Sequence, residues 1–274
     1  MMNKKDRPHI LLTNDDGIRS PGLWAAAEAL SDLGYVVVAA PRDQSSGAGR
    51  SMPRSSDGSI RQEEVEVGGK CWPVYAVGGS PAQAVQHGVL EIAERKPDLV
   101  VAGINYGENI GIGITISGTV GAALEAAALG IPALAVSLET DMSFHLSYSK
   151  EVDFSVAAYF AHMFAQHILS SDRLPDVDVL KIDVPSHATV DTPWQYTRIS
   201  RGKYYYPVIA PREEGQSDGP ITYGIHEAPE TWEEDSDVHT LRVAKHVSVT
   251  PISLDMTSRV NGDQLNHWFS PDRS

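Results

Sequence analysis

The chain has 274 residues, of which 42% are hydrophobic and 21% are charged, with 22 lysines and arginines against 36 aspartates and glutamates. Its formal charge of −14 disfavours nonspecific binding to polyanions such as DNA, RNA or an acidic membrane surface. That charge does not exclude one small phosphorylated ligand held by a local site. The single cysteine, Cys71, excludes an intramolecular disulfide and fits a reducing compartment.

The amino terminus and the most apolar stretch of the chain give no sign of a membrane. The amino terminus, MMNKKDRPHI, has basic residues but no apolar stretch of roughly 7–15 residues behind them, so we expect no signal peptide. Residues 120–138 are interrupted by Glu125, Gly130 and Pro132, and therefore fail as a membrane span. We expect a cytoplasmic protein without a membrane or a nucleic acid polymer as partner.

The first elements of the chain predict a strand, a helix and a second strand. Residues 10–13 form a short apolar run typical of a buried strand, and Pro21 then opens a helix over 21–30. Residues 35–40 are a second continuous apolar run. A strand, a helix and a strand within about 30 residues indicate a βαβ unit with a parallel sheet.

Two β-like stretches, 59–67 and 71–77, lie on either side of the turn Gly68-Gly69 and predict a pair of antiparallel strands. Ser80 is then expected as the N-cap of a helix that begins at Pro81 and runs to about residue 96. The later apolar segments predict three strands and two helices, over 98–102, 119–129, 132–136, 151–170 and 179–184. Five buried strands that alternate with helices predict an α/β fold with a doubly wound, Rossmann-like, mostly parallel sheet.

The sequence changes character beyond about residue 185. Tyrosine-rich and β-like pieces appear at 196–208 and 221–225, separated by acidic turns. We therefore divide the chain into an α/β core over 1–185 and a β-rich C-terminal extension over 186–274. The extension is too open for a compact second domain, and we expect it to pack between subunits as an arm of the same domain.

Oxygen-bearing side chains follow three predicted strands where each strand ends. Asp15 and Asp16 follow the first, Ser46 the second and Asn105 the third. Ligands of a doubly wound sheet bind beyond the carboxyl ends of its strands. Two carboxylates, a hydroxyl and an amide oxygen suit Mg²⁺ or Mn²⁺, which would also relieve the repulsion between the aspartates. An Asp-Asp-Gly turn and a turn asparagine are the plainer alternative.

A glycine-rich loop over residues 103–121, GINYGENIGIGITISGTVG, leads into the helix predicted from residue 119. Its glycines let backbone N–H groups approach an anion closely. Ser117, Gly118 and Thr119 lie where the helix begins, and a helix N-terminus favours a phosphate. The alternative is that Ser117 or Thr119 only caps the helix.

Four segments together resemble the stationary-phase survival protein SurE family. They are ILLTNDDGIRSPGL at 10–23, SSGAG at 45–49, VVAGINYGENIG at 100–111 and SGTVGAALEAAALGIPALAVSL at 117–138, in the order of the family. The resemblance is strong over about residues 8–185 and weak beyond them. It implies a metal-dependent nucleotidase for nucleoside 5′- and 3′-monophosphates, with short polyphosphate as a further substrate of some members.

The resemblance also implies roles for individual residues. Asp15, Asp16, Ser46 and Asn105 match the metal ligands, and Asn109, Ser117, Gly118 and Thr119 match the phosphate-binding residues. It implies one divalent cation, Mg²⁺ or Mn²⁺, in each subunit, and a homodimer or homotetramer with exchanged C-terminal arms. Two positions depart from the family pattern, because Ile116 replaces a tyrosine and Gln83 replaces an aspartate.

We expect a phosphoric monoester hydrolase of the 5′-nucleotidase type, in which a metal-activated water attacks phosphorus directly. The strand ends carry no Asp-x-Asp pair, no paired Ser-His nucleophile and no cysteine, so Asp15 or Asp16 would help take the proton. Two alternatives stay open. One is a receiver-like Mg²⁺-binding signalling domain without hydrolase activity, although Asn105 stands where such a domain needs its phosphoacceptor aspartate. The other is a phosphatase acting mainly on short polyphosphate.

Overall fold

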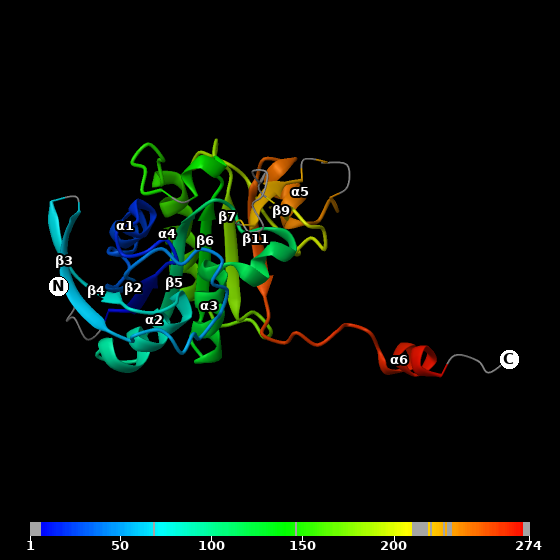
Figure 1. Cartoon of the computed structure of the whole chain (residues 1–274), viewed down its shortest axis with the longest axis horizontal. Helices are drawn as coiled ribbons and strands as arrows, with labels where there is room; N and C mark the ends of the chain where they lie inside the picture. The colour runs from blue at the N-terminus through cyan, green and yellow to red at the C-terminus, as the bar shows by residue number, and fades with distance from the viewer. Residues whose placement is uncertain are drawn as a thin grey trace.

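The computed structural model describes residues 7–67, 69–145, 147–209, 219, 221–226, 228 and 232–270. Gly68 of the predicted turn lies outside them. The described chain forms one large sheet with helices on both faces (Figure 1). Its strands are β1 (His9–Thr13), β2 (Tyr35–Pro41), β3 (Ile60–Val67), β4 (Lys70–Val77), β5 (Leu99–Tyr106), β6 (Ala133–Leu138), β7 (Val179–Val184), β8 (Trp194–Tyr196) and β11 (Val247–Ile252).

The strand order in this sheet is β3-β4-β2-β1-β5-β6-β7-β11-β8. The strands from β4 to β7 run parallel, whereas β3 and β11 are antiparallel to their neighbours β4 and β7. Strand β1 lies between β2 and β5, with Leu12 paired to Val38 on one side and to Val101 on the other. The chain changes direction across the sheet at β1, so the doubly wound, mostly parallel fold is confirmed.

The helices cover both faces of the sheet, and this explains why the central strands are apolar without alternation. The helices are α1 (Pro21–Leu30), α2 (Pro81–His87), α3 (Gly118–Ala128), α4 (Ser155–Ser170), α5 (Asp237–Arg242) and α6 (Gly262–Phe269). Helices α1 and α4 pack on one face, and α2 and α3 on the other. No helix among the described residues is long and apolar enough to span a bilayer.

Helix α2 begins as the sequence predicts and ends earlier. The Ser80 hydroxyl accepts from the Gln83 amide at 3.2 Å, and the Gln83 side chain accepts from the Ser80 amide at 2.9 Å. This capping box explains why a glutamine is favourable at position 83. A π-helical turn, Gly88–Ile92, follows, and the helical stretch ends short of residue 96 because the backbone of Ala93 is extended.

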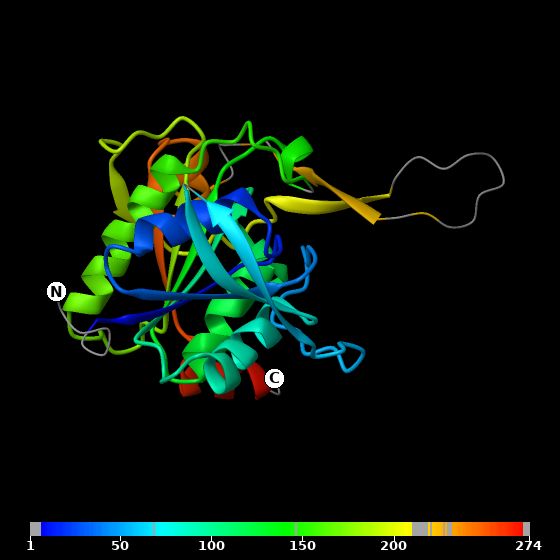
Figure 2. The same ribbon diagram turned by 90° about the vertical axis from the view of Figure 1, so that its left-hand side faces the viewer.

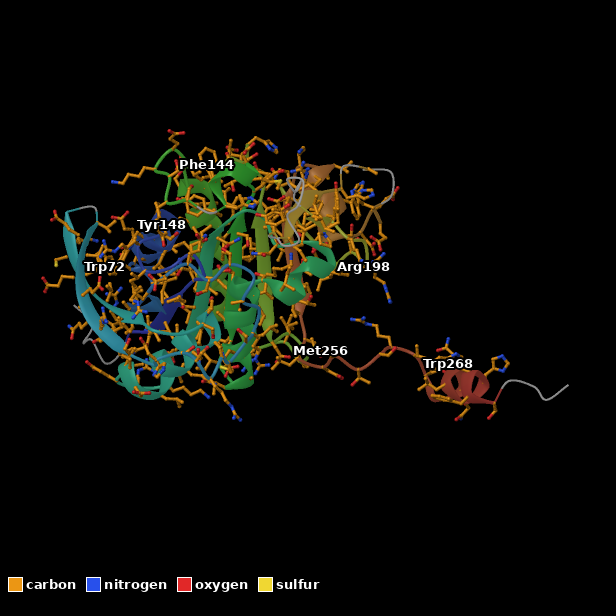
Figure 3. All side chains as sticks on the ribbon, viewed as in Figure 1. Trp72, Phe144, Tyr148, Arg198, Met256 and Trp268 are labelled. Atoms are coloured by element: carbon orange, nitrogen blue, oxygen red, sulfur yellow. The ribbon has the colours of Figure 1, made fainter. Side chains whose placement is uncertain are left out.

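The segment after residue 185 adds β8 and β11 to the main sheet, so the β-rich character of the extension is confirmed. Strands β9 (Tyr205–Ile209) and β10 (Ile221–Ile225) form a separate antiparallel pair, here called the β9–β10 ribbon, which projects from the body (Figure 2). Beyond β11 the chain leads away from the sheet to α6 (Figure 1). Met256 and Trp268 along this segment are 85% and 72% exposed (Figure 3).

Candidate active site

A cavity of about 580 Å³ opens where β1 and β5 end, on the two sides of the switch in strand order. Its lining includes five of the eight residues that the sequence singles out, namely Asp15, Ser46, Asn105, Asn109 and Ser117. The other three, Asp16, Gly118 and Thr119, adjoin Asp15 along the chain or through direct contacts with its side chain. The topology thus brings all eight residues to one edge of the sheet.

Helix α3 begins against the carboxylate of Asp15. The Thr119 hydroxyl donates to Asp15 Oδ1, and the nearby backbone amides of Gly118 and Thr119 favour the ionised form of this carboxylate. A Cβ atom on Gly118 would lie 2.7 Å from Asp15 Oδ2, so only glycine allows this approach. The partial positive charge of the helix N-terminus therefore faces the carboxylate. The hydroxyl of Thr119 is fully buried, and the Asp15 carboxylate is its hydrogen-bond acceptor.

The carboxylate of Asp16 is held from two sides and is 1% exposed. The Tyr106 amide donates to Oδ2 at 3.3 Å, and Gln44 Nε2 donates to Oδ1 at 3.3 Å. Burial raises the pKa of Asp15, and burial together with the charge of Asp15 raises the pKa of Asp16 well above its ordinary value. Within the described parts of the chain neither carboxylate has an ion pair, so the site lacks positive charge.

Asn105 owes its position to an irregularity in β5. The pairing of β5 with β6 shifts between Ala102 and Asn105, so that Asn105 lies opposite Ser137. Gly103 occupies this point with φ +133°, and a Cβ there would lie 2.3 Å from the carbonyl oxygen of Val136. The Asn105 amide nitrogen donates to the carbonyls of Tyr106 and Gly107 at 3.0 and 2.7 Å. In this orientation its amide oxygen has no hydrogen-bond donor among the described residues, so it is available to a cation.

The residues at the cavity fit a hard divalent cation. Nowhere among the described residues do three His, Cys, Asp or Glu side chains gather as metal ligands. A cation at the aspartate pair would therefore take its remaining ligands from the neutral oxygens of Ser46 and Asn105 and from water. Such an all-oxygen set is the one that Mg²⁺ and Mn²⁺ prefer. The uncompensated negative charge of the pair is a second reason for the fit.

Two buried carboxylates accept hydrogen bonds from the backbone of the loop that carries Asn109. Asp183 on β7 accepts from the Asn109 amide at 2.7 Å, and Asp237 on α5 accepts from the Gly111 amide at 3.1 Å. The Asn109 side chain donates to the Ser137 hydroxyl at 2.9 Å. The phosphate-binding loop expected from the sequence is thus anchored to β6, β7 and α5.

Lys181 lies between these two carboxylates and is itself fully buried. Its ammonium group donates to Asp183 and forms an ion pair with Asp237 at 3.3 Å. When all three side chains are ionised, the carboxylates of Asp183 and Asp237 and the ammonium group of Lys181 together carry one excess negative charge. Burial raises the pKa of Asp183 to about 6 despite the adjacent ammonium group.

Sequence reasoning missed several residues around the cavity. Lys181 and Asp183 carried a signal, because two charged residues in a strand predicted as buried, VLKIDV, need partners inside the protein. His145 and Tyr223 also line the cavity, beside Tyr205 from the tyrosine-rich segment. For His145 and Tyr223 no local pattern indicates that residues so far apart in the chain meet beside Asn109.

The fold and the site define a doubly wound α/β protein with a candidate cation and phosphate site at its topological switch point. The family model described as "Survival protein SurE" matches residues 10–206. The chain therefore belongs to the SurE family, as its motifs indicate.

Similar proteins support this assignment over nearly the whole length. The protein named 5′-nucleotidase SurE from Thermococcus gammatolerans is 42% identical over 258 residues, which cover 94% of each chain. The protein of the same name from Methanosarcina mazei is 40% identical and covers 98% of this chain and 100% of the relative. The crystal structure of the SurE protein from Aquifex aeolicus matches with a TM-score of 0.70 and 31% identity, over 92% of this chain and 95% of that one.

Proposed function

We propose that this chain is a metal-dependent nucleotidase that releases phosphate from nucleoside monophosphates, the 5′-monophosphates above all. The observation that carries the proposal is the cavity in which Asp15, Asn105, Asn109 and Ser117 meet at the carboxyl edge of the sheet. The relatives from T. gammatolerans and M. mazei are named 5′-nucleotidases, and these names support a nucleotide as the substrate here.

Asp15, Asp16, Ser46 and Asn105 are proposed to hold one Mg²⁺ or Mn²⁺ in each subunit. When bound, the cation would lower the pKa of a water molecule and offset the negative charge of the phosphate. The hydroxyl of Thr119 keeps the Asp15 carboxylate in place. One carboxylate of the pair is proposed to accept the proton of the attacking water.

Ser117, Asn109 and the N-terminus of α3 are proposed to bind the phosphate oxygens. The Ser117 oxygen accepts from the Val120 amide at 3.1 Å, which leaves its hydroxyl hydrogen free to donate to a phosphate. Ser117 therefore serves both as the helix cap and as a ligand-binding residue. Donors that are already oriented stabilise the charge that develops on these oxygens without reorganisation.

A substrate screen tests the proposal. The purified chain is assayed for phosphate release from 5′-AMP, 3′-AMP and tripolyphosphate, with Mn²⁺, with Mg²⁺ and with EDTA. We expect 5′-AMP as the best substrate, no turnover in EDTA, and loss of nearly all turnover in Asp15→Asn and Asp16→Asn. Turnover that persists in EDTA, or tripolyphosphate as the best substrate, would contradict the proposal.

We also propose that residues 1–185 form the catalytic core and that residues 186–274 extend the same domain and join subunits into a homodimer or homotetramer. The detached segment with α6 supports an exchanged arm, because Trp268 and Phe269 are 72% and 74% exposed and need a surface to cover them. The free cysteine, Cys71, supports a cytoplasmic compartment.

A further inference from the structure

The cavity continues from Asn109 to the β9–β10 ribbon, which gives it an aromatic wall. The antiparallel register pairs Pro207 with Tyr223 and Ile209 with Ile221. Side chains two residues apart in a strand share a face, so Tyr205, Pro207, Ile221 and Tyr223 lie on one face of the ribbon. All four of these residues line the cavity, as do Tyr206 and Thr222, which alternate with them along the two strands.

Hydrogen bonds and ring contacts hold this wall against the phosphate end of the site. The Tyr205 hydroxyl donates to the carbonyl of Glu108, the residue directly before Asn109, at 3.3 Å. The Tyr223 ring meets the Tyr205 ring edge to face, with centroids 5.4 Å apart. The Tyr223 hydroxyl pairs with His145 Nδ1 at 2.9 Å. The wall is therefore formed before any ligand binds.

Three of the four wall residues are exposed, Tyr205 is half-buried, and none of the four is charged. The side chains of Tyr223 and Ile221 are 40% and 72% exposed, and Ile116, which directly precedes Ser117 and also lines the cavity, is 62% exposed. None of the described residues that line the cavity is a lysine or an arginine. A polyphosphate tail needs cationic partners along its length, whereas a flat neutral ring gains by covering an apolar and aromatic surface.

We propose that this wall is the nucleobase subsite of the enzyme, with the Tyr223 ring as its principal stacking surface. This inference rests on the proposed function and deepens it, since it names the part of the substrate that distinguishes a nucleotide from other phosphate esters. Base and aromatic ring stack through their faces, and the contact tolerates different bases. The phosphate binds at Asn109 and Ser117, and the base covers Tyr223 and Ile221.

The test compares 5′-AMP with ribose 5-phosphate, which carries the same phosphate and sugar without the base. For the wild-type chain we expect a higher kcat/KM with 5′-AMP. Tyr223→Ala should lower kcat/KM for 5′-AMP about ten times more than it lowers kcat/KM for ribose 5-phosphate. Tyr223→Phe keeps the ring and should retain the preference. Tyr159→Ala on α4, where the tyrosine is 42% exposed, is the matched control and should behave as wild type.

Equal effects of Tyr223→Ala on both substrates, or no wild-type preference for 5′-AMP, would overturn the subsite. A fall for both substrates with a lower mass in light scattering would identify the wall as a contact between copies of the chain. Equilibrium dialysis with radiolabelled adenosine separates the two proposals. If neither ester is hydrolysed, the proposed activity fails, and the subsite stands only if adenosine binds the wild type and not Tyr223→Ala.

Discussion

The hydroxyl of Thr119 donates a hydrogen bond to the carboxylate of Asp15, and so ties the first turn of α3 to the end of β1. Removing a partner that orients a metal ligand lowers metal affinity or activity by about 10–100-fold. We expect Thr119→Val to weaken Mn²⁺ binding and kcat to this extent, and Thr119→Ser to restore both. Isothermal titration with Mn²⁺ and steady-state assays check the result. Unchanged Mn²⁺ affinity in Thr119→Val would show that Asp15 needs no such support.

Lys181 is expected to be essential for stability, since its loss leaves Asp183 and Asp237 buried without a counter-charge. Breaking a buried ion pair on one side costs about 3–5 kcal/mol. Lys181→Met should lower the free energy of unfolding in urea by about this amount and raise KM for 5′-AMP through the loosened Asn109 loop. The exposed Lys150→Met is the control, with an expected change below about 0.5 kcal/mol.

The raised pKa of Asp183 predicts a pH dependence of stability. Its folded-state pKa of about 6 lies above the ordinary value of 3.8, so the folded chain holds this proton after the unfolded chain has lost it. This contribution favours unfolding increasingly as the pH rises from about 4 to about 6, by roughly 3 kcal/mol in total. Asp183→Asn should remove it. Urea unfolding of both proteins at several pH values measures the difference in slope, and parallel curves would contradict the assignment.

The exposed arm predicts an effect of truncation on assembly. A chain that ends at Leu254 keeps the hydrogen bond from the Leu254 amide to Asp178 at 2.7 Å and loses α6 with its exposed aromatic rings. We expect the full chain to scatter light as a multiple of 29.7 kDa and the truncated chain to have a lower mass. A full chain at the monomer mass would rule out the exchanged arm.

Direct attack of water on phosphorus predicts inversion of configuration. A chiral thiophosphate ester hydrolysed in ¹⁸O-water reports the outcome, because one displacement inverts phosphorus and two displacements through a phosphoenzyme retain its configuration. Inversion is expected here. Retention would require a nucleophilic side chain at the cavity, and the proposed roles of Asp15 and Asp16 would then have to change.

The central fold could be predicted because its signals are local. Continuous apolar runs mark β1, β2, β5 and β6, and proline or glycine marks where the helices start and stop. The carboxyl ends of parallel strands share one edge, so the meeting of Asp15 with Asn105 follows from strand order alone. The similarity to the SurE family added the roles that were assigned to these residues.

The rest depends on contacts that no short window of sequence contains. Ser248 and Thr250 in β11 alternate with valines, so the sequence alone predicts that they face solvent. Both are buried instead, and their hydroxyls form hydrogen bonds with the Thr197 hydroxyl at 2.9 and 2.7 Å. The register shift that places Asn105 opposite Ser137 depends on β6, and the pairing of Lys181 with Asp237 depends on α5. In each case a partner distant in the chain decides the outcome.

The β9–β10 ribbon is separate from the sheet that holds the aspartate pair, and this separation has an evolutionary consequence. Changes at Pro207 and Ile221 leave the hydrogen bonds around Asp15 and Asp16 untouched, whereas Tyr223 is linked to Asp16 through His145 and Gln44. Selection is therefore free to retune which leaving group the enzyme accepts while the hydrolytic machinery stays constant. For the same reason, libraries confined to these ribbon positions are the natural starting point for redirecting the enzyme to other phosphate esters.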